Sequence, residues 1–120
     1  MTIQEQYENL EKTVRGYNPA ADFQHIRAAF EFAAEAHKDQ KRKTGEPYII
    51  HPLAVAQIVA EELRLDSESI EAALLHDVIE DTAATHEQVS KLFSPTIADL
   101  VEGVSKLTRI QYATKEDEQM

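Results

Sequence analysis

The sequence predicts an all-α protein, and three observations support this prediction. Apolar residues recur every three or four positions along most of the chain, which is the spacing of an amphipathic helix. No segment alternates apolar and polar residues as a half-buried strand does. Of the three glycines and four prolines, all but one lie at the boundaries of the helical segments, where helices end or begin.

Between the N-terminus and residue 48 the pattern predicts two helices and a loop. Residues 2–14 place four apolar side chains on one face, and the Gly-Tyr-Asn-Pro segment at 16–19 ends this helix. Residues 20–39 are predicted to form a longer helix with apolar side chains at i, i+3 and i+4 steps. The polar segment 38–48 contains a glycine and a proline and is predicted to be a loop.

The next two helices are predicted over residues 52–64 and from Asp66 or Ser67 to about Asp81. Pro52 suits the first turn of the former, because the N–H that proline lacks would have no partner there. Asp66 and Ser67 are both common N-cap residues. The apolar spacing then continues to about residue 81, so a single helix is expected.

Two more helices are predicted further along the chain. Thr85 and Gln88 form the pattern of a capping box in front of a helix at 86–93. The Ser-Pro pair at 94–95 is predicted to begin another helix, which extends to about Leu107.

The chain is predicted to be one domain over residues 1–120. Residues 1–18 would form an N-terminal helix and turn, and residues 19–110 would form the core helices. Residues 111–120 are helix-prone and acidic but end without a cap, so they are expected to be the start of a truncated helix. The chain is therefore interpreted as a fragment of a longer protein, in which exposed apolar surface would favour self-association.

Composition narrows the class of protein and its partners. The chain has 120 residues, 42% hydrophobic and 28% charged, as globular proteins do. Its 12 basic and 22 acidic residues give a net charge of −10, which argues against DNA and anionic membranes as partners. The absence of cysteine excludes disulfides, thiolate zinc sites and cysteine nucleophiles. With no apolar run long enough to span a bilayer and no signal peptide, a cytoplasmic location is expected.

The segment 73–82 contains the residues from which chemistry is expected. His76 and Asp77 are adjacent polar residues in an apolar helical run, and burying them without a partner would cost several kcal/mol. The partner is either a divalent metal ion or hydrogen bonds to other helices. Glu80 and Asp81 lie four residues further on, so the four side chains are predicted to form a polar strip along one side of the helix.

His51 is the third candidate metal ligand. It precedes Pro52 at the start of a predicted helix, from which its imidazole can meet His76 and Asp77 across a helix pair. Two imidazoles and one carboxylate suit manganese, whereas zinc and iron are disfavoured but not excluded. Calcium would require more oxygen ligands.

A basic cluster lies in the loop before His51. Lys38, Lys41, Arg42 and Lys43 place four of the twelve basic residues within six positions. The cluster is interpreted either as a solvated loop or, beside a metal site, as a clamp for phosphate groups.

Other polar residues are predicted to be structural or solvated. Glu68 and Glu71 are placed in the first turn of their helix, within an acidic face that is expected to be solvated. His37 continues the apolar face of its helix and is interpreted as a core or loop-anchoring residue. His25 and His86 are predicted to lie at the surface.

The stretch from Ile26 to Leu107 resembles the hydrolase domain of the RelA/SpoT homologue family, enzymes that make and degrade (p)ppGpp, the alarmone of the stringent response. Two segments carry most of the resemblance, RKTGEPYIIHP at 42–52 and LLHDVIEDT at 74–82. The segment LFSPTIADLVEGVSKLT and the acidic KEDEQM follow in the family's order and spacing. The Thr-Gly-Glu-Pro-Tyr segment is typical of long, multidomain members.

The resemblance implies the helical HD fold of metal-dependent phosphohydrolases, which is named after its His-Asp pair. It also implies that manganese is bound by His51, His76 and Asp77. Glu80 and Asp81 would orient and deprotonate a metal-activated water that attacks the 3′-pyrophosphate of (p)ppGpp, giving GDP or GTP and pyrophosphate. Arg42 would border the guanine ring of the substrate, and Lys43 its phosphate or base.

Family members carry two further features that this sequence lacks. One is a fourth metal ligand, an aspartate in a later stretch similar to KLADRLHN, and the other is a nearby asparagine that contacts the ribose. Neither occurs before Met120. The chain is therefore expected to bind manganese weakly and to hydrolyse ppGpp slowly or not at all. The parent protein would be a competent hydrolase, with a synthetase domain following.

Three other interpretations are consistent with parts of the pattern. A catalytically silent regulatory domain of a (p)ppGpp synthetase would keep the fold but lose the metal, and the presence of His51, His76, Asp77, Glu80 and Asp81 argues against it. A phosphohydrolase of the same fold acting on deoxynucleotides or cyclic dinucleotides would lack the RKTGEPY segment. A purely structural helical module would need its buried polar side chains to pair with one another.

Overall fold

The computed structural model describes residues 2–41 and 44–103, and its regular elements in these ranges are helices. The elements are, in order, α1 (Ile3–Tyr17), α2 (Phe23–Ala36), α3 (Ile50–Ile58), η1 (Val59–Leu63), α4 (Ser67–Leu75), α5 (Val78–Asp81) and α6 (His86–Leu92). Residues 95–103 are also helical. Within the described ranges no strand forms, although an isolated bridge joins Lys41 to Pro47 in the loop before α3. The predicted all-α class is confirmed.

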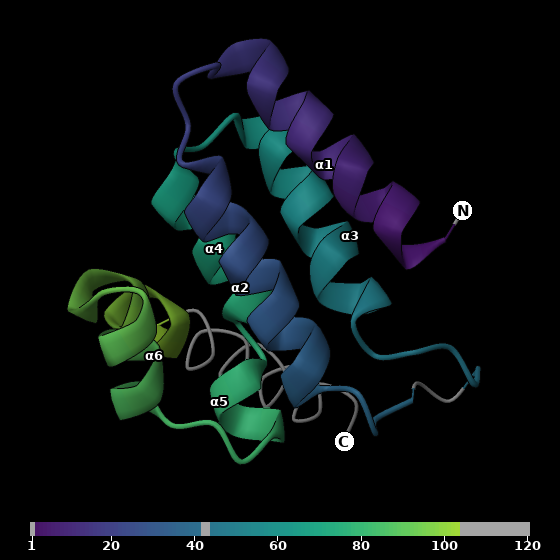
Figure 1. The fold of residues 1–120 in the computed structure, drawn as a ribbon, viewed down its shortest axis with the longest axis vertical. Coiled ribbons are helices and arrows are strands. Elements are labelled where there is room, and N and C mark those ends of the chain that lie inside the picture. The colour runs from purple at the N-terminus through teal and green to yellow at the C-terminus, as the bar shows by residue number, and fades with distance from the viewer. Residues whose placement is uncertain (1, 42–43, 104–120) are drawn as a thin grey trace, which may run out of the picture.

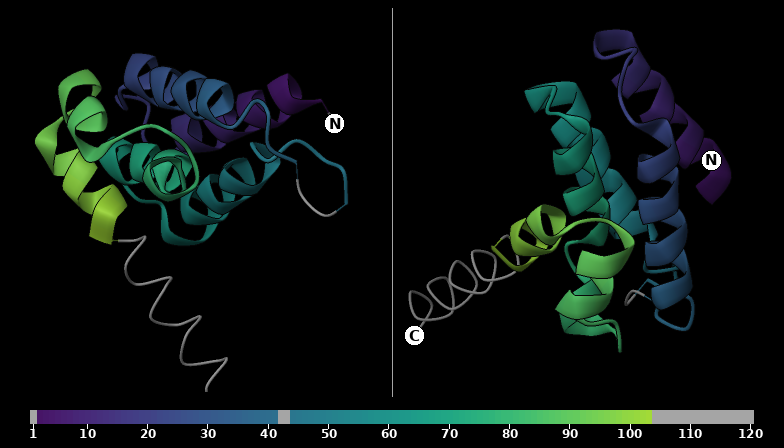
Figure 2. Two further views of the ribbon diagram at one scale, coloured as in Figure 1. Left: turned by 90° about the horizontal axis from the view of Figure 1, so that it is seen from below. Right: turned by 60° about the vertical axis from the view of Figure 1, so that its left-hand side comes forward.

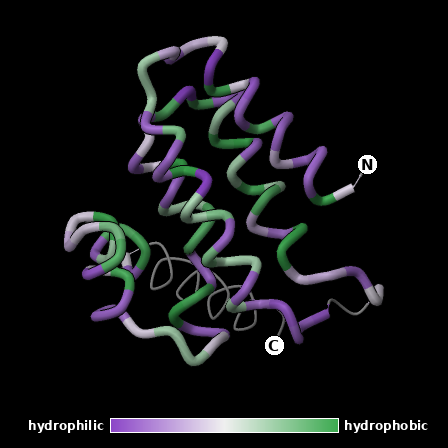
Figure 3. The backbone as a smooth tube through the Cα atoms, in the orientation of Figure 1, coloured by the Kyte–Doolittle hydropathy of each residue, from purple (hydrophilic) through white to green (hydrophobic). Residues whose placement is uncertain are grey.

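The first four α-helices form a bundle that supports the rest of the molecule (Figure 1). α2 packs along α4, and α3 contacts both α1 and α4. α5, α6 and residues 95–103 lie at one end of this bundle (Figure 2). Figure 3 shows α3 as mostly hydrophobic and α1 as mostly hydrophilic, with apolar residues at intervals along α1. Large side chains of the buried core include Tyr7, Leu10, Ile26, Phe30, Leu53, Ile70, Leu74 and Leu75.

Three predicted helix starts are confirmed, and each is fixed by a side-chain cap. Asp66 and Ser94 each accept a hydrogen bond from the backbone N–H three residues on, at 2.9 and 3.0 Å. Thr85 and Gln88 make the predicted capping box at α6. These caps satisfy N–H groups that have no partner within the helix. The predicted helical residues 104–107 and 111–120 lie outside the described residues.

The boundaries of the first two helices differ from the prediction. α1 continues to Tyr17 rather than ending at residue 14, because the helical conformation is first disfavoured immediately before Pro19. α2 begins at Phe23 rather than at residue 20. Asp22 sets this start, since its carboxylate accepts a hydrogen bond from the backbone N–H three residues on, at 3.1 Å. α2 ends at Ala36, and residues 37–39 form a turn.

α3 begins at Ile50, two residues earlier than predicted, so His51 lies inside its first turn. Pro52 is tolerated at this position because the first four N–H groups of a helix have no intrahelical acceptor. The helix continues through the π-helical turn η1 to Leu63. It ends at Arg64 in the left-handed conformation, with φ at 47°, and the predicted end of this helix at residue 64 is confirmed.

The predicted uninterrupted helix from residue 66 or 67 to residue 81 is wrong. α4 ends at Leu75, α5 begins at Val78, and His76 and Asp77 form a turn between them. The ring nitrogen Nδ1 of His76 lies 2.6 Å from the carbonyl oxygen of Ala73. In a continuous α-helix this oxygen would pair with the N–H of Asp77. The side chain of His76 thus occupies the acceptor that the helix needs in order to continue.

Glu71 is also placed differently from the prediction of a solvated first-turn residue. Its side chain is 1% exposed, and one of its oxygens has no hydrogen-bond partner among the described residues. The imidazole of His25, on α2, lies 3.8 Å away. Burial raises the pKa of Glu71 to about 7, and the negative charges of Asp22, Glu68 and Asp66 act in the same direction. A carboxyl group in this position is most compatible with the fold when it is protonated.

No helix in the described ranges is both long enough and apolar enough to cross a bilayer.

Replacing Glu71 by glutamine tests the cost of this buried carboxylate. The folded pKa of about 7 exceeds the ordinary value of 4.5, so the folded state retains a proton that the unfolded state has lost. Stability is therefore expected to fall as the pH rises through this interval. Glu71→Gln should remove most of the fall and stabilise the protein by about 2 kcal/mol at pH ~8. Urea unfolding at pH ~5 and ~8 measures both effects.

The control for this measurement is Glu62→Gln, which removes an equal charge from an exposed position in η1. An unchanged pH dependence in Glu71→Gln would show that Glu71 is not the group responsible.

Candidate metal centre

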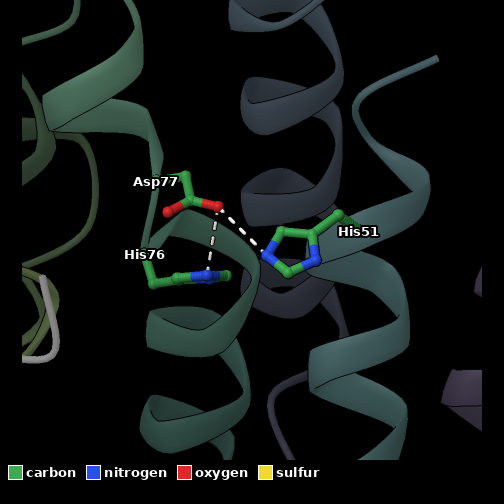
Figure 4. A group of neighbouring side chains, drawn as sticks. All are labelled: His51, His76 and Asp77. Atoms are coloured by element: carbon green, nitrogen blue, oxygen red, sulfur yellow. Dashed lines mark ion pairs between the residues drawn. The ribbon is translucent and has the colours of Figure 1, made fainter. Parts of the chain in front are cut away.

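Three side chains from two helical regions converge at one point, as the sequence predicts. His51 lies in the first turn of α3, and His76 and Asp77 form the turn between α4 and α5. Oδ2 of Asp77 is 3.4 Å from Nε2 of His51 and 3.1 Å from Nε2 of His76. Figure 4 shows this carboxylate oxygen directed at both rings. One donor atom from each residue lies within 4.8 Å of the others.

This donor set fits a divalent metal ion. An ion bound at about 2.1 Å by each ligand holds neighbouring ligand atoms about 3.0–3.4 Å apart. The two separations at Asp77, 3.1 and 3.4 Å, fall in this range. Two imidazole nitrogens and a carboxylate oxygen are donors that borderline divalent ions accept.

A contact of Nδ1 of His76 orients the ring so that Nε2 faces the centre. Nδ1 contacts the Ala73 carbonyl oxygen at 2.6 Å, so a proton at Nδ1 donates to that oxygen and Nε2 keeps its lone pair for the centre. The residue is 6% exposed, with apolar neighbours in the sequence that are fully buried. The position of this ring is therefore fixed by the core of the bundle.

The electrostatics of the centre favour a positive charge between its donors. Burial alone would raise the pKa of Asp77, but the hydrogen bond and charge of His76, with Tyr48 and His51, lower it below its ordinary value. Burial would lower the pKa of His76, but hydrogen bonds to Asp77 and the Ala73 carbonyl and the nearby acidic charges raise it. A cation bound here would take the place of the proton that this pair otherwise shares.

Tyr48 belongs to the same centre, although the sequence analysis did not select it. Its hydroxyl oxygen lies 2.8 Å from Oδ2 of Asp77 and 3.1 Å from Oδ2 of Asp81. Its ring packs on the buried ring of His37, with centroids 4.6 Å apart. Burial and the two carboxylates raise the pKa of Tyr48, so its hydroxyl remains a proton donor. The available signal in the sequence is its position three residues before His51.

Of the two predicted catalytic carboxylates, Asp81 is linked to the centre through Tyr48. Asp81 and Glu80 are in the short helix α5, and both are exposed. The hydroxyl of Tyr48 links Asp81 to Asp77. The amide of Gln40 donates a hydrogen bond to the backbone carbonyl of Asp81, which ties α5 to the loop after α2. Of the predicted polar strip, His76, Asp77 and Asp81 are thus connected. The proton donor between the two aspartates is Tyr48, from the loop before α3.

The basic cluster is described only in part. Lys38, in the turn after α2, forms a surface ion pair with Glu35 at 2.8 Å. Lys41 is exposed and bridges to Pro47. Arg42 and Lys43, which were predicted to bind substrate, lie outside the described residues.

The remaining histidines are placed as the sequence predicts. His37 is 2% exposed and anchors the following loop through a 2.7 Å contact between its Nδ1 and Oε1 of Gln40. The side chains of His25 and His86 are 51% and 41% exposed.

The family model for the HD domain matches residues 29–120. The chain belongs to the HD domain family. The resemblance that the His-Asp pair and its flanking segments carry is therefore confirmed at the level of the family, and its helical fold agrees.

This HD domain is similar to several curated relatives. It is 47% identical over 113 residues to the bifunctional (p)ppGpp synthase/hydrolase SpoT of Escherichia coli (strain K12). The aligned residues make up 94% of this chain and 16% of that protein. It is 51% identical over 111 residues to the guanosine-3′,5′-bis(diphosphate) 3′-pyrophosphohydrolase of Aquifex aeolicus (strain VF5). Here the aligned residues make up 92% of this chain and 16% of that protein. The HD domain thus spans about a sixth of the length of these relatives.

A solved structure described as a metazoan ortholog of SpoT that hydrolyzes ppGpp has a similar fold. The TM-score is 0.65 at 38% sequence identity, over 68% of this chain and 47% of the other.

Replacing Tyr48 by phenylalanine tests its role in the centre. The substitution keeps the ring on His37 but removes the hydrogen bond that holds Oδ2 of Asp77. Loss of a partner that orients a ligand costs roughly 10- to 100-fold in metal affinity, and we expect a loss of about tenfold for Mn²⁺. Isothermal titration with Mn²⁺ measures it.

Tyr17→Phe is the matched control, because that hydroxyl donates to the Leu65 carbonyl at 2.7 Å, away from the centre. Equal Mn²⁺ affinity in Tyr48→Phe and wild type would contradict the assigned role of Tyr48.

Proposed function

We propose that this HD domain is a divalent-metal-dependent (p)ppGpp 3′-pyrophosphohydrolase, with Mn²⁺ as the ion. The observation that carries the proposal is the convergence of His51, His76 and Asp77, whose donor atoms lie within 4.8 Å of one another. The names of the relatives supply the substrate, since proteins 47% and 51% identical to this chain are named for (p)ppGpp hydrolysis. The products would be GDP or GTP and pyrophosphate.

A bound divalent ion supplies two things, a lower pKa for water and neutralisation of charge on the phosphoryl group. The two imidazoles and Asp77 would hold the ion between the first turn of α3 and the turn that follows α4. Asp81 or Glu80 would accept a proton from the attacking water as its oxygen bonds to the phosphorus on the 3′ oxygen. The bond between that phosphorus and the 3′ oxygen breaks, the 3′ oxygen takes up a proton, and pyrophosphate leaves. Tyr48 positions Asp77 and Asp81 through its hydroxyl group. Arg42 and Lys43 would contact the guanine nucleotide.

A catalytically silent regulatory domain is the second candidate. The GTP pyrophosphokinase of Myxococcus xanthus is 50% identical over 97 residues, covering 81% of this chain and 13% of that protein, so high identity extends to a protein named for synthesis. The three convergent donors favour hydrolysis, because a silent domain has no need to keep two imidazoles and a carboxylate around one point.

The wider setting is also inferred from the relatives. The relative from Escherichia coli is named as a bifunctional synthase/hydrolase, and we infer that a synthetase domain accompanies this HD domain in its natural protein. A cytoplasmic location and self-association of the isolated chain stay predictions.

Product analysis tests the proposed reaction. The purified chain, incubated at high concentration with ppGpp and Mn²⁺, is expected to release GDP and pyrophosphate slowly, and His76→Ala should abolish the release. If the chain gives no product, the same assay on a chain extended beyond Met120 decides between slow hydrolysis and a silent domain. Release at equal rates from wild type and His76→Ala, or release of orthophosphate instead of pyrophosphate, would contradict the proposal.

The roles of Glu80 and Asp81 can be separated from metal binding. Glu80→Gln and Asp81→Asn remove proton acceptors but leave His51, His76 and Asp77 in place. We expect single-turnover hydrolysis at saturating Mn²⁺ to fall by roughly 10²- to 10⁴-fold, while Mn²⁺ affinity changes little. Glu87→Gln, an exposed change on α6, serves as the control. A loss of metal affinity as large as the loss of rate would instead make these residues ligands.

A further inference from the structure

A second group of metal-donor side chains lies outside the His51 centre. His86 is the first residue of α6, and Asp99 and Glu102 lie in the helical segment 95–103. Nε2 of His86 is 3.0 Å from Oδ1 of Asp99 and 3.6 Å from Oε2 of Glu102. All three donor atoms lie within 4.8 Å of one another. α6 and the segment 95–103 lie next to each other at the end of the bundle (Figure 2).

The backbone geometry aims these groups at one point. Asp99 and Glu102 are three residues apart on one helix, so both project from the same face. That face meets the first turn of α6, from which His86 projects towards both. The donors therefore come from two separate elements, and a ligand bound to all three would join these elements.

The separations match those around a small divalent ion. A tetrahedral ion with bonds of about 2.1 Å keeps its ligand atoms about 3.4 Å apart. The two contacts of His86, at 3.0 and 3.6 Å, lie on either side of this value. The third pair, the carboxylate oxygens of Asp99 and Glu102, lies within 4.8 Å.

The chemistry of the group also favours a cation. A single ring nitrogen cannot satisfy two carboxylates, because it carries one proton at most. A divalent ion would neutralise both negative charges, in a chain whose net charge is −10. One imidazole nitrogen and two carboxylate oxygens suit zinc, which binds such sites more tightly than manganese does.

We propose that His86, Asp99 and Glu102 form a second divalent-cation site of the zinc class, which clamps α6 to the segment 95–103. The side chains are 41%, 74% and 46% exposed, so water can reach the ion and complete its coordination. The site shares no residue with the His51 centre, and the proposal does not depend on (p)ppGpp hydrolysis. Its role is structural.

Zinc titration in a His51→Ala background tests the proposal. That substitution removes one donor of the first centre from a side chain that is 34% exposed, and circular dichroism checks that the chain still folds. We expect this variant to bind zinc at the second site with a rise in Tm. Adding His86→Ala should abolish both, and adding Asp99→Asn or Glu102→Gln should each weaken binding by about tenfold. Binding is measured by isothermal titration and by the visible spectrum of cobalt.

His25→Ala in the same background is the matched control. His25 is an exposed histidine with two acidic neighbours, Asp22 and Glu71, at 3.4 and 3.8 Å, and its loss should leave zinc binding unchanged. If zinc is instead held by the remaining His76–Asp77 pair, binding will be unchanged when His86 is also replaced by alanine. That outcome would overturn the proposal. Absence of zinc binding in His51→Ala overturns it as well and leaves His86 with surface ion pairs only.

Discussion

The candidate metal centre depends on the interruption of the helix at His76 and Asp77. In a continuous helix neighbouring side chains diverge by about 100°, so the two residues would face α3 less directly. His76 removes this restriction itself, because its Nδ1 occupies the Ala73 carbonyl that would bond the N–H of Asp77. The same contact directs Nε2 of His76 into the centre, where it meets Asp77 at 3.1 Å. One hydrogen bond thus both ends α4 and orients the ligands.

The bundle fixes the metal donors more firmly than the proposed catalytic groups. His76 is buried among core residues, and His51 lies in a turn whose neighbours Pro52 and Leu53 are buried. Glu80 and Asp81 are exposed on a helix of four residues. This division suits hydrolysis, since ligands must hold their geometry while proton acceptors must exchange protons with water. Tyr48 connects the two zones through its hydroxyl group.

Periodicity and capping residues predict the helical class, most helix starts and the meeting of His51 with His76 and Asp77. They fail where a side chain competes with the backbone, as at His76, because apolar spacing continues through the break. The first-turn position of Glu71 in an acidic stretch predicts a solvated side chain, yet it lies one turn before Leu75 among the buried residues of α4. Its burial depends on how α2 and α4 pack, as the contact of Tyr48 depends on the path of its loop. Neither is encoded in local spacing.

The two donor clusters show why convergence of ligands alone does not make a hydrolytic site. Both bring an imidazole within 3.0–3.6 Å of a carboxylate oxygen. At the His51 centre one wall is buried, so water would screen the charge on a bound substrate poorly. The hydroxyl of Tyr48 also connects the candidate ligand Asp77 to the exposed carboxylate of Asp81, which is a nearby proton acceptor. At His86 all three donors face solvent, where water screens their charges. Such a site can hold two helices together, but it offers a phosphoryl group little stabilisation that water does not already provide.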